Sequence, residues 1–154
     1  MIKKGIILAG GSGTRLSPLT KSVNKQLLPI HDKPMIFYPL SVMMLANIKK
    51  ILMIVNPGQI NNFKSLLGDG SRYGISIDYK IQDKPRGLPD AFILGKNFIN
   101  NENVALILGD NFFYGQSLTK KLEKSSIHKS GATIFLKEVS SPENYGVAKI
   151  KKKI

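Results

Sequence analysis

Residues 5–15 read Gly5-Ile6-Ile7-Leu8-Ala9-Gly10-Gly11-Ser12-Gly13-Thr14-Arg15. Four apolar residues of strand length lead directly into a loop that contains three glycines and ends in an arginine. Because glycine carries no Cβ, the backbone N–H groups of such a loop can approach a chain of phosphates closely. The stretch therefore predicts a β-strand followed by a loop that binds a nucleoside triphosphate.

This loop differs from the two commonest glycine-rich phosphate loops. A P-loop requires a glycine, four further residues and then Gly-Lys-Ser or Gly-Lys-Thr, and this spacing does not occur in the sequence. The dinucleotide fingerprint requires a third glycine where Leu16 stands. A tight structural turn after the first strand remains the alternative. Arg15 and, ten residues later, Lys25 favour phosphate binding because both are cations.

The composition is that of one globular unit. With 154 residues, 42% of them hydrophobic, the chain can bury one substantial core but not two. The absence of cysteine excludes disulfides, thiolate zinc sites and cysteine nucleophiles, and His31 and His128 stand alone. The apolar run after Lys3 and Lys4 is shorter than the core of a secretion signal, and no run has membrane length. We expect a single cytoplasmic domain with no membrane partner.

The chain is strongly basic, with a formal net charge of +13. Clustered basic residues would predict nucleic-acid binding, but the lysines are scattered and only three of the 23 basic residues are arginines. Lys151, Lys152 and Lys153 form the only run of three. The pattern favours a basic surface around a site for anionic substrates. Binding to unrelated oligonucleotides that weakens steeply with salt would instead indicate a nucleic-acid-binding protein.

Apolar segments of strand length alternate with segments that can form helices. The predicted strands are Ile6–Ala9, Ile51–Val55, Ile75–Ile81, Val104–Leu108 and Ala132–Val139, and the predicted helices are Met35–Ile48, Gln59–Leu67, Leu88–Phe98 and Ser117–His128. This alternation predicts an α/β fold with right-handed crossovers, a mainly parallel sheet and ligands at the carboxyl ends of the strands. Met35–Ile48 is apolar nearly all round, so we expect it to be buried in the core or in a contact between subunits of a homo-oligomer.

Three side chains near the predicted loops can act on phosphates. Asp110 follows the strand Val104–Leu108 and can hold Mg²⁺, which prefers carboxylate oxygens and bridges substrate phosphates. A turn or a helix cap explains Asp110 equally well. Arg15 and Lys25 can stabilise the charge that builds when an α-phosphorus is attacked. Most lysines of this chain face solvent, but Gln26-Leu27-Leu28-Pro29 looks like a buried segment able to fix the direction of Lys25.

Gln82 and Gly87 are candidates for contacts with a base. The Gln82 amide can donate one hydrogen bond and accept another from an imino N–H, and Gly87 lets the backbone approach the base. The pair therefore suits a pyrimidine such as thymine or uracil. A polar loop residue beside a turn glycine is the alternative interpretation.

Several segments together resemble a known family. They are Gly10-Gly11-Ser12-Gly13-Thr14-Arg15-Leu16, Lys25-Gln26-Leu27-Leu28-Pro29, Asp32-Lys33-Pro34-Met35-Ile36, Tyr38-Pro39-Leu40-Ser41, Gly109-Asp110-Asn111 and Tyr145-Gly146-Val147. Up to about Val147 the chain resembles the sugar nucleotidylyltransferases, most closely the branch that transfers a thymidylyl group to glucose 1-phosphate. The resemblance implies a Rossmann-like three-layer sandwich with a mainly parallel sheet, the fold of the nucleotide-diphospho-sugar transferases.

The resemblance also implies a reaction and a set of site residues. An oxygen of glucose 1-phosphate attacks the α-phosphorus of dTTP with the help of Mg²⁺, which gives dTDP-glucose and pyrophosphate. Arg15 and Lys25 would be catalytic and contact the phosphates, and Asp110 would bind the metal. The nucleotide-binding residues would be Leu8, Gly10, Gly11, Ser12, Gly13, Thr14, Arg15, Gln82 and Gly87, and the sugar-binding residues Asn111 and Gly146.

The sequence departs from the family pattern in two ways. Family members usually have Gly-Leu-Ala, a polar residue and Ala where this chain has Gly87-Leu88-Pro89-Asp90-Ala91, so Asp90 adds a charge near the base pocket. Relatives also continue further and supply a Glu-Lys-Pro segment that grips the sugar phosphate and a second metal-binding aspartate. We therefore expect residues 1–154 to be a nucleotidyltransferase domain that is incomplete at its C-terminus and turns over weakly or not at all. The alternatives are a uridylyltransferase for a sugar 1-phosphate and a noncatalytic nucleotide-binding fragment.

Overall fold

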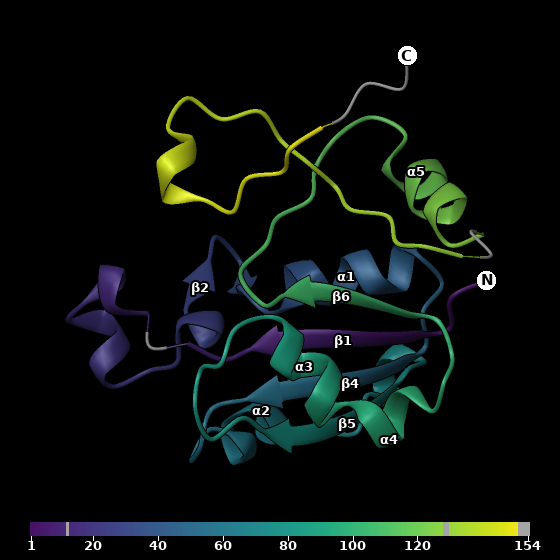
Figure 1. The fold of residues 1–154 in the computed structure, drawn as a ribbon. Coiled ribbons are helices and arrows are strands. Elements are labelled where there is room, and N and C mark those ends of the chain that lie inside the picture. Colours follow the sequence, from purple (N-terminus) through teal and green to yellow (C-terminus); the bar gives the residue numbers. More distant parts are fainter. Residues whose placement is uncertain (12, 128–129, 151–154) are drawn as a thin grey trace.

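The computed structural model describes residues 1–11, 13–127 and 130–150. Its centre is a sheet of four parallel strands in the order β5-β4-β1-β6 (Figure 1). The strands are β1 (Lys4–Ala9), β4 (Lys50–Val55), β5 (Ser76–Ile81) and β6 (Val104–Leu108). The structure confirms these four predicted strands and the parallel α/β fold.

The register of the sheet brings the carboxyl ends of the four strands to one edge. Ala9 at the end of β1 pairs with Val55 of β4, and Val55 pairs with Ile81 of β5. On the other side of β1, Leu8 pairs with Leu108 of β6. The loops after all four strands therefore start at the same level, which is where parallel sheets bind ligands.

One face of the sheet packs against α1 (Phe37–Leu45), α2 (Ile60–Leu67) and α5 (Leu118–Ser125). Ile7 of β1 and Met53 of β4 are fully buried on this face. Their buried partners on the three helices include Leu40, Phe63 and Leu122. Each fully buried aliphatic or aromatic side chain stabilises the fold by about 1.5–3 kcal/mol.

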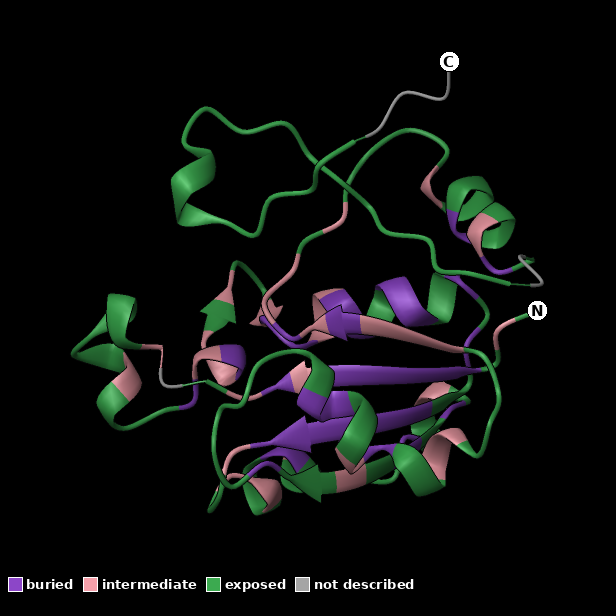
Figure 2. Ribbon diagram, viewed as in Figure 1, coloured by how far each residue is buried: buried purple, intermediate pink, exposed green. Residues whose placement is uncertain are grey.

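The opposite face packs against α3 (Pro89–Leu94) and α4 (Lys96–Ile99). Because successive strand residues point to opposite faces, Ile6 and Ile54 lie here while their neighbours along the chain lie on the first face. Ala91 of α3 is buried against them. Helices on both faces of a sheet make the predicted three-layer sandwich, and Figure 2 shows the buried residues concentrated in its middle layer.

Short elements fill the connection between β1 and α1. They are the 3-10 turns η1 (Thr14–Leu16), η2 (Leu19–Lys21) and η3 (Lys25–Leu27) and an antiparallel pair of β2 (Pro29–Ile30) and β3 (Lys33–Pro34). Two further 3-10 turns are η4 (Ser71–Tyr73) and η5 (Pro142–Asn144). Within the described ranges, no helix is both long and apolar enough to cross a membrane.

Two predicted helices differ from the observed ones. α1 is shorter than predicted, and its Pro39 causes no break because it lies in the first turn, where no N–H is required. One side of α1 is not covered by the core of this chain, since Leu45 is 47% exposed, so of the expected burial the structure confirms the part in the core, and the contact between subunits stays a prediction. The predicted helix 88–98 is divided into α3 and α4 at Gly95, where an added Cβ would lie 3.0 Å from Ile6 Cδ1.

The predicted strand Ala132–Val139 is wrong. The described segment 130–150 is an exposed loop that contains only the short turn η5, as Figure 2 shows. A strand needs a neighbour for its N–H and C=O groups, and this segment pairs with none of the described strands. The predicted helix 117–128 ends as α5 at Ser125, and His128 and residues 151–154 lie outside the described residues.

Candidate functional site

Glycines and polar residues follow the four parallel strands at the edge where they end. Gly10 follows β1, Asn56 follows β4, Gln82 follows β5, and Gly109 with Asp110 follows β6. An open cavity of about 270 Å³ lies at this edge and is the larger cavity of the two at this site. It is lined by Leu8, Gly10, Gly11, Gln26, Gln82, Pro85, Gly87, Leu88, Leu108 and Asp110. Residues predicted for the nucleotide and the residue predicted for the metal therefore surround one space.

Asn56 fixes the start of the glycine loop. Its Nδ2 donates to the carbonyl oxygen of Gly11 at 2.8 Å, and its Oδ1 accepts from the N–H of Gly11 at 3.1 Å. Gly11 has φ +101°, a conformation that glycine adopts without strain. An ideal Cβ on Gly10 would lie 3.1 Å from both Asn56 Oδ1 and Gln82 Oε1. The loop therefore requires glycine at Gly11 for its turn and at Gly10 for the close approach of two side chains.

The loop continues through Gly13, which has φ +60°. Its carbonyl oxygen accepts a hydrogen bond from Thr20 Oγ1 at 2.8 Å. An ideal Cβ on Gly13 would lie only 2.8 Å from Thr20 Cγ2. A side chain at Gly13 would therefore strain the loop and displace Thr20. Ser12, another predicted nucleotide contact, lies outside the described residues.

Thr14 and Arg15 are exposed on η1. A second cavity of about 210 Å³ adjoins the first at Gly11 and is lined mainly by residues 20–25 and by Asn56. Neither Thr14 nor Arg15 is among the described residues that line the two cavities. The structure thus places the predicted phosphate contact Arg15 on a turn outside the cavity walls.

Lys25 and Asp110 form an ion pair, with Lys25 Nζ 2.7 Å from Asp110 Oδ2. Lys25 begins η3, and Asn24 caps this turn by accepting a hydrogen bond from the N–H of Gln26 at 2.9 Å. The Lys25 and Asp110 side chains are 28% and 32% exposed. Because exposed ion pairs contribute only about 0–1 kcal/mol, an anionic ligand can separate this pair at small cost.

Gln26 lies buried between the glycine loop and the loop after β6. Its Nε2 donates to the carbonyl oxygen of Gly10 at 3.1 Å, and an ideal Cβ on Gly109 would lie 2.9 Å from Gln26 Cγ. Its Oε1 is buried and has no hydrogen-bond partner within the described part of the chain. An unpaired buried acceptor costs about 1–3 kcal/mol, so a donor supplied at this position would stabilise the protein.

Asp110 offers one carboxylate for a metal ion. Among the described residues, no group of three or more His, Cys, Asp or Glu side chains could hold one. The donor set therefore does not suit zinc, which takes three or four protein ligands. It fits Mg²⁺, which takes one or two carboxylates and completes its shell with waters and substrate phosphates.

The predicted base contacts, Gln82 and Gly87, lie on the connection between β5 and α3 and line the larger cavity. Gln82 is buried, and its Nε2 donates to Asp90 Oδ2 at 2.8 Å. Gly87 has φ +88°, so a side chain there would strain the backbone. The turn at Gly87 thus brings bare backbone to the cavity beside the Gln82 amide.

A salt bridge holds the same loop. Arg86 donates to both carboxylate oxygens of Asp83 at 2.9 Å, and its Nη1 lies 3.7 Å from Asp90 Oδ2. The hydrogen bonds from Arg86 hold the pKa of the Asp83 carboxyl below its usual value, and the same bonds raise the pKa of Arg86. Such a bidentate pair has a defined geometry, so it restricts the path of the loop above Asp90.

The two predicted sugar contacts are not brought together. Asn111 follows Asp110, and its N–H donates to the carbonyl oxygen of Leu108 at 3.1 Å. Gly146 lies in the exposed segment 130–150, and an ideal Cβ there would meet nothing within 4 Å. Their roles as sugar contacts stay predictions.

Gln26, Asn56 and Asp90 belong to the site but are not among the predicted site residues. Asn56 directly follows a buried strand, as Asp110 does, so the argument that selected Asp110 could also have selected Asn56. Gln26 is a buried amide within a segment that was singled out for Lys25. The sequence indicates Asp90 only as a charge near the base pocket, because no sequence pattern reveals its hydrogen bond to Gln82.

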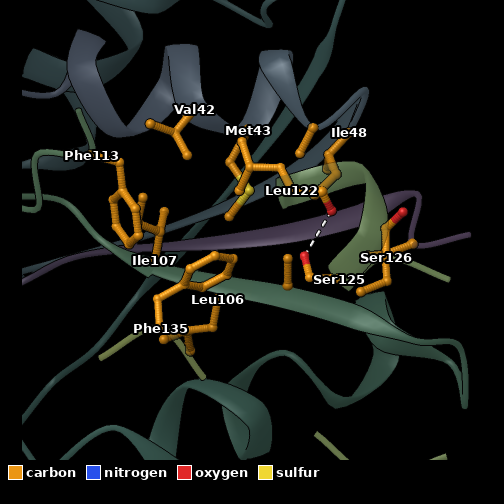
Figure 3. Close-up of a pocket in the computed structure, with 13 residues that line it drawn as sticks. Val42, Met43, Ile48, Leu106, Ile107, Phe113, Leu122, Ser125, Ser126 and Phe135 are labelled. Atoms are coloured by element: carbon orange, nitrogen blue, oxygen red, sulfur yellow. Dashed lines mark hydrogen bonds between the residues drawn. The ribbon is translucent and has the colours of Figure 1, made fainter. Parts of the chain in front are cut away.

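A separate cavity of about 80 Å³ lies between α1, β6 and α5 (Figure 3). Apolar side chains surround it, among them Met43, Phe113 and Phe135, and its described lining includes no charged residue. Ser125, one of its two serines, donates its hydroxyl to the carbonyl oxygen of Leu122 at 2.7 Å. The described lining of this cavity thus offers no cation for phosphates, and no predicted site residue belongs to it.

Curated relatives of this chain include glucose-1-phosphate thymidylyltransferases. A glucose-1-phosphate thymidylyltransferase from Neisseria meningitidis serogroup A is 60% identical over 144 residues, which are 94% of this chain and 50% of the relative. A protein of the same name from Xanthomonas campestris pv. campestris is 53% identical over 146 residues, which are 95% of this chain and 50% of the relative. The chain therefore spans about half the length of the curated relatives it matches.

Solved structures and family models agree with this result. A Bacillus anthracis protein described as a glucose-1-phosphate thymidylyltransferase, solved in complex with sucrose, has a TM-score of 0.88 to this structure at 39% identity. The match covers 96% of this chain and 60% of that one. Residues 4–154 match the family model described as nucleotidyl transferase. With its parallel sheet, its glycine loop and this match over almost its whole length, the chain belongs to the nucleotidyl transferase family.

Proposed function

We propose that this chain supplies the nucleotide-binding part of a glucose-1-phosphate thymidylyltransferase. One observation carries the proposal: the loops after β1, β5 and β6 converge on a single cavity, with Gly10, Gln82 and Asp110 in its wall. Phosphate, base and metal contacts are therefore available within one space. Relatives at 53% and 60% identity carry the name of this activity.

In the proposed reaction, an oxygen of glucose 1-phosphate attacks the α-phosphorus of dTTP. A new phosphorus–oxygen bond forms, the bond from the α-phosphorus to the oxygen that bridges to the β-phosphate breaks, and pyrophosphate leaves in line. The glycine loop would bind the phosphates through its backbone N–H groups. Arg15 would offer a planar guanidinium and Lys25 a compact ammonium to the charge that develops on the transferred group.

The ion pair between Lys25 and Asp110 supports an exchange of partners on binding. An entering triphosphate would compete with Asp110 for the Lys25 ammonium, and Asp110 would then be available to hold Mg²⁺. When bound, Mg²⁺ would neutralise charge on the phosphates. The pair is only 2.7 Å apart yet partly exposed, so the exchange keeps both groups in reach of the phosphates at little cost in stability.

The nucleoside would occupy the part of the cavity lined by Gln82 and Gly87. The Gln82 amide suits the edge of a pyrimidine that carries an imino N–H, which thymine and uracil share. The unpaired Oε1 of Gln26 supports a donor on the ligand, such as a sugar hydroxyl. Asn111 and Gly146 remain the proposed contacts of glucose 1-phosphate.

Ligand-dependent stabilisation tests the proposal. The melting temperature of the purified chain is measured with Mg²⁺ and with dTTP, UTP or dCTP, and we expect dTTP to raise it because a ligand that binds only the folded state stabilises it. Lys25→Gln should weaken dTTP binding about 10-fold by removing a charged contact, whereas Lys120→Gln on the exposed face of α5 should not. If none of the nucleotides raises the melting temperature, the proposal is wrong.

Pyrophosphate exchange separates the remaining alternatives. We expect weak or absent formation of dTDP-glucose by this chain, because it supplies one metal-binding carboxylate and no Glu-Lys-Pro segment. Stabilisation by dTTP without any pyrophosphate exchange would indicate a noncatalytic nucleotide-binding chain. A stronger response to UTP than to dTTP would indicate a uridylyltransferase.

A further inference from the structure

Asp90 is an aspartate that the proposed chemistry does not use, although only 6% of its surface is exposed. It lies in the first turn of α3, next to the buried Ala91, but its hydrogen bond runs to the loop rather than to the helix backbone. Its Oδ2 accepts a hydrogen bond from Gln82 Nε2 at 2.8 Å. Burying a carboxylate is costly unless it is paired. A six-residue helix does not by itself need a buried aspartate, so the contact with Gln82 suggests a role outside the helix.

The chemistry of the two groups determines how the Gln82 amide is oriented. A carboxylate oxygen only accepts hydrogen bonds, whereas an amide donates through nitrogen and accepts through oxygen. Arg86 Nη1 lies 3.7 Å from the same Asp90 oxygen, so both neighbouring side chains turn donor groups toward it. The NH₂ group of Gln82 must therefore face Asp90, and the amide oxygen must face away from it.

The amide oxygen of Gln82 faces the glycine loop. An ideal Cβ on Gly10 would lie 3.1 Å from Gln82 Oε1, and Gly10 and Gln82 both line the larger cavity. The Asp90 contact thus presents a hydrogen-bond acceptor on the cavity side of Gln82. Without Asp90 the amide could turn over and present its NH₂ group there instead.

We propose that Asp90 is a positioning residue for base selection: by holding Gln82 Nε2, it keeps Gln82 Oε1 as a fixed acceptor for a ring N–H of the base. This inference rests on the proposed function, in which the cavity binds a pyrimidine nucleoside triphosphate. N3 of thymine or uracil carries a hydrogen and satisfies the acceptor, whereas N3 of cytosine is itself an acceptor and is repelled. A site built to hydrogen-bond one group rejects an analogue that lacks it, because a buried polar atom is left unpaired.

Base preference in variants of the 154-residue chain tests this role. The dissociation constants of dTTP and dCTP are measured by calorimetry with Mg²⁺ for the wild type, Asp90→Asn and Gln82→Ala. Asn has nearly the shape of Asp but can donate or accept, so it no longer dictates the orientation of Gln82. We expect the wild type to prefer dTTP and Asp90→Asn to lose about 5- to 10-fold of that preference.

Two controls separate positioning from a general effect of charge or packing. Asp78→Asn removes an exposed carboxylate of β5 outside the walls of the two site cavities and should change the ratio of the two constants less than about 2-fold. In the Gln82→Ala background, Asp90→Asn should cause no further loss of preference, because the two residues act as one unit. A purely structural role of Asp90 would weaken both nucleotides equally.

A measurement without nucleotide covers the case in which Asp90→Asn folds poorly. In ¹⁵N-labelled wild-type protein, the side-chain NH₂ signal of Gln82, assigned by its loss in Gln82→Ala, should exchange slowly with D₂O.

Rapid exchange in the folded chain would overturn the inference, and so would an unchanged dTTP preference in Asp90→Asn when Gln82→Ala loses it. Equal binding of dTTP and dCTP by the wild type would also overturn it. Absence of binding by any nucleotide would refute the proposed function first and the inference with it.

Discussion

Two apolar stretches of this chain differ completely in their burial. Ile51–Val55 of β4 are between 0% and 4% exposed, whereas Ile134, Phe135 and Leu136 are 68%, 45% and 57% exposed. Both stretches are rich in the residues that favour strands. β4 lies between two paired strands and under helices on both faces, while residues 132–139 pair with none of the described strands. The comparison shows that strand propensity leads to a buried strand only where neighbours pair with the backbone and cover both faces.

The same difference in burial separates the candidate site from its predicted sugar contact Gly146. The residues that line the larger cavity all lie between Leu8 and Asp110, whereas Gly146 belongs to the exposed segment. That segment approaches the sheet through Phe135, whose ring centroid lies 5.6 Å from that of Phe113 at the edge of the apolar cavity in Figure 3. The cavity of the candidate site thus lies wholly in the packed sheet region, whereas the described segment 130–150 is exposed and adds no residue to its wall.

Limited proteolysis should give the largest difference between the two regions. We expect trypsin to cleave after Lys137, in the exposed segment, at least about 100-fold faster than after Lys4 in β1, because cleavage in the sheet requires it to open first. Mass spectrometry of early digestion products measures the two rates. Equal initial rates at the two lysines would show that the sheet region is no more stable than the segment.

A pair of matched truncations compares the packing directly. Ile7→Ala in β1, where Ile7 is fully buried, should lower the free energy of unfolding by about 2–5 kcal/mol by creating a cavity. Ile134→Ala should change it by less than about 0.5 kcal/mol, because its side chain is 68% exposed. Denaturant unfolding followed by circular dichroism measures both. A large loss in Ile134→Ala would mean that the segment packs against the sheet.

A pair of glycine substitutions compares the backbone of the two regions. Gly13→Ala should cost about 2 kcal/mol, because φ is +60° and the new Cβ would lie 2.8 Å from Thr20 Cγ2. Gly146→Ala should have little effect on stability, since its Cβ would meet nothing within 4 Å. Unfolding curves and dTTP titrations of both variants are the measurements. An unchanged Gly13→Ala protein would contradict the proposed strain in the loop.

A pair of asparagine substitutions should cause a smaller difference in the free energy of unfolding between the two regions. Asn56→Ala removes two hydrogen bonds to Gly11 and should lower the free energy of unfolding by about 1 kcal/mol and weaken dTTP binding. Asn144→Ala removes an exposed 3.4 Å contact with Glu143 and should be neutral. Amide exchange at Gly11 reports the effect locally. If Gly11 stays equally protected in Asn56→Ala, another group fixes the loop.

The pH dependence of stability should give the smallest effect. Burial raises the pKa of Tyr79 to about 12, with a smaller contribution from Asp69. The folded state holds this proton more tightly than the unfolded state, so the contribution to stability is fully present below about pH 10 and is lost as the pH rises through about 12. After discounting for partial exposure, it amounts to less than about 1 kcal/mol.

The control for Tyr79 comes from the exposed segment. Tyr79→Phe should remove this component of the loss between about pH 10 and 12, whereas Tyr145→Phe should retain it. Denaturant unfolding at several pH values measures the effect. A steep alkaline loss that persists in Tyr79→Phe would show that other groups cause it.

Much of the fold could be predicted because the relevant signals are local. Four short apolar runs predict β1, β4, β5 and β6 correctly, since each has the length and the flanking turns of a buried strand. The predicted strand Ala132–Val139 has the same local signal and fails, because pairing depends on which backbone lies beside it. The close approach of Ile6 to Gly95, where helix 88–98 divides, is likewise a contact with the sheet that the local sequence does not reveal.

Some residues of the candidate site could be predicted from the sequence, but the contacts between them could not. Gly10, Gln82 and Asp110 could be selected from their chemistry and their places after strands, because glycine loops and side chains at strand ends are properties of short segments. Lys25 could be selected from its charge and the apolar residues that follow it. The contacts that relate them could not be selected. Lys25 and Asp110 are 85 residues apart, and Gln82 and Asp90 meet across the loop between β5 and α3.

The sequence by itself determined which segments can form strands, where the glycine loop lies and which side chains can act on phosphates, because hydrophobic period and side-chain chemistry are local. Only the tertiary structure decided which strands have neighbours, that Lys25 pairs with Asp110, and that Gln82 presents its oxygen to the cavity. These are relations between atoms far apart along the chain. Burial and hydrogen-bond partners exist only after the sheet brings those atoms within a few ångströms of each other.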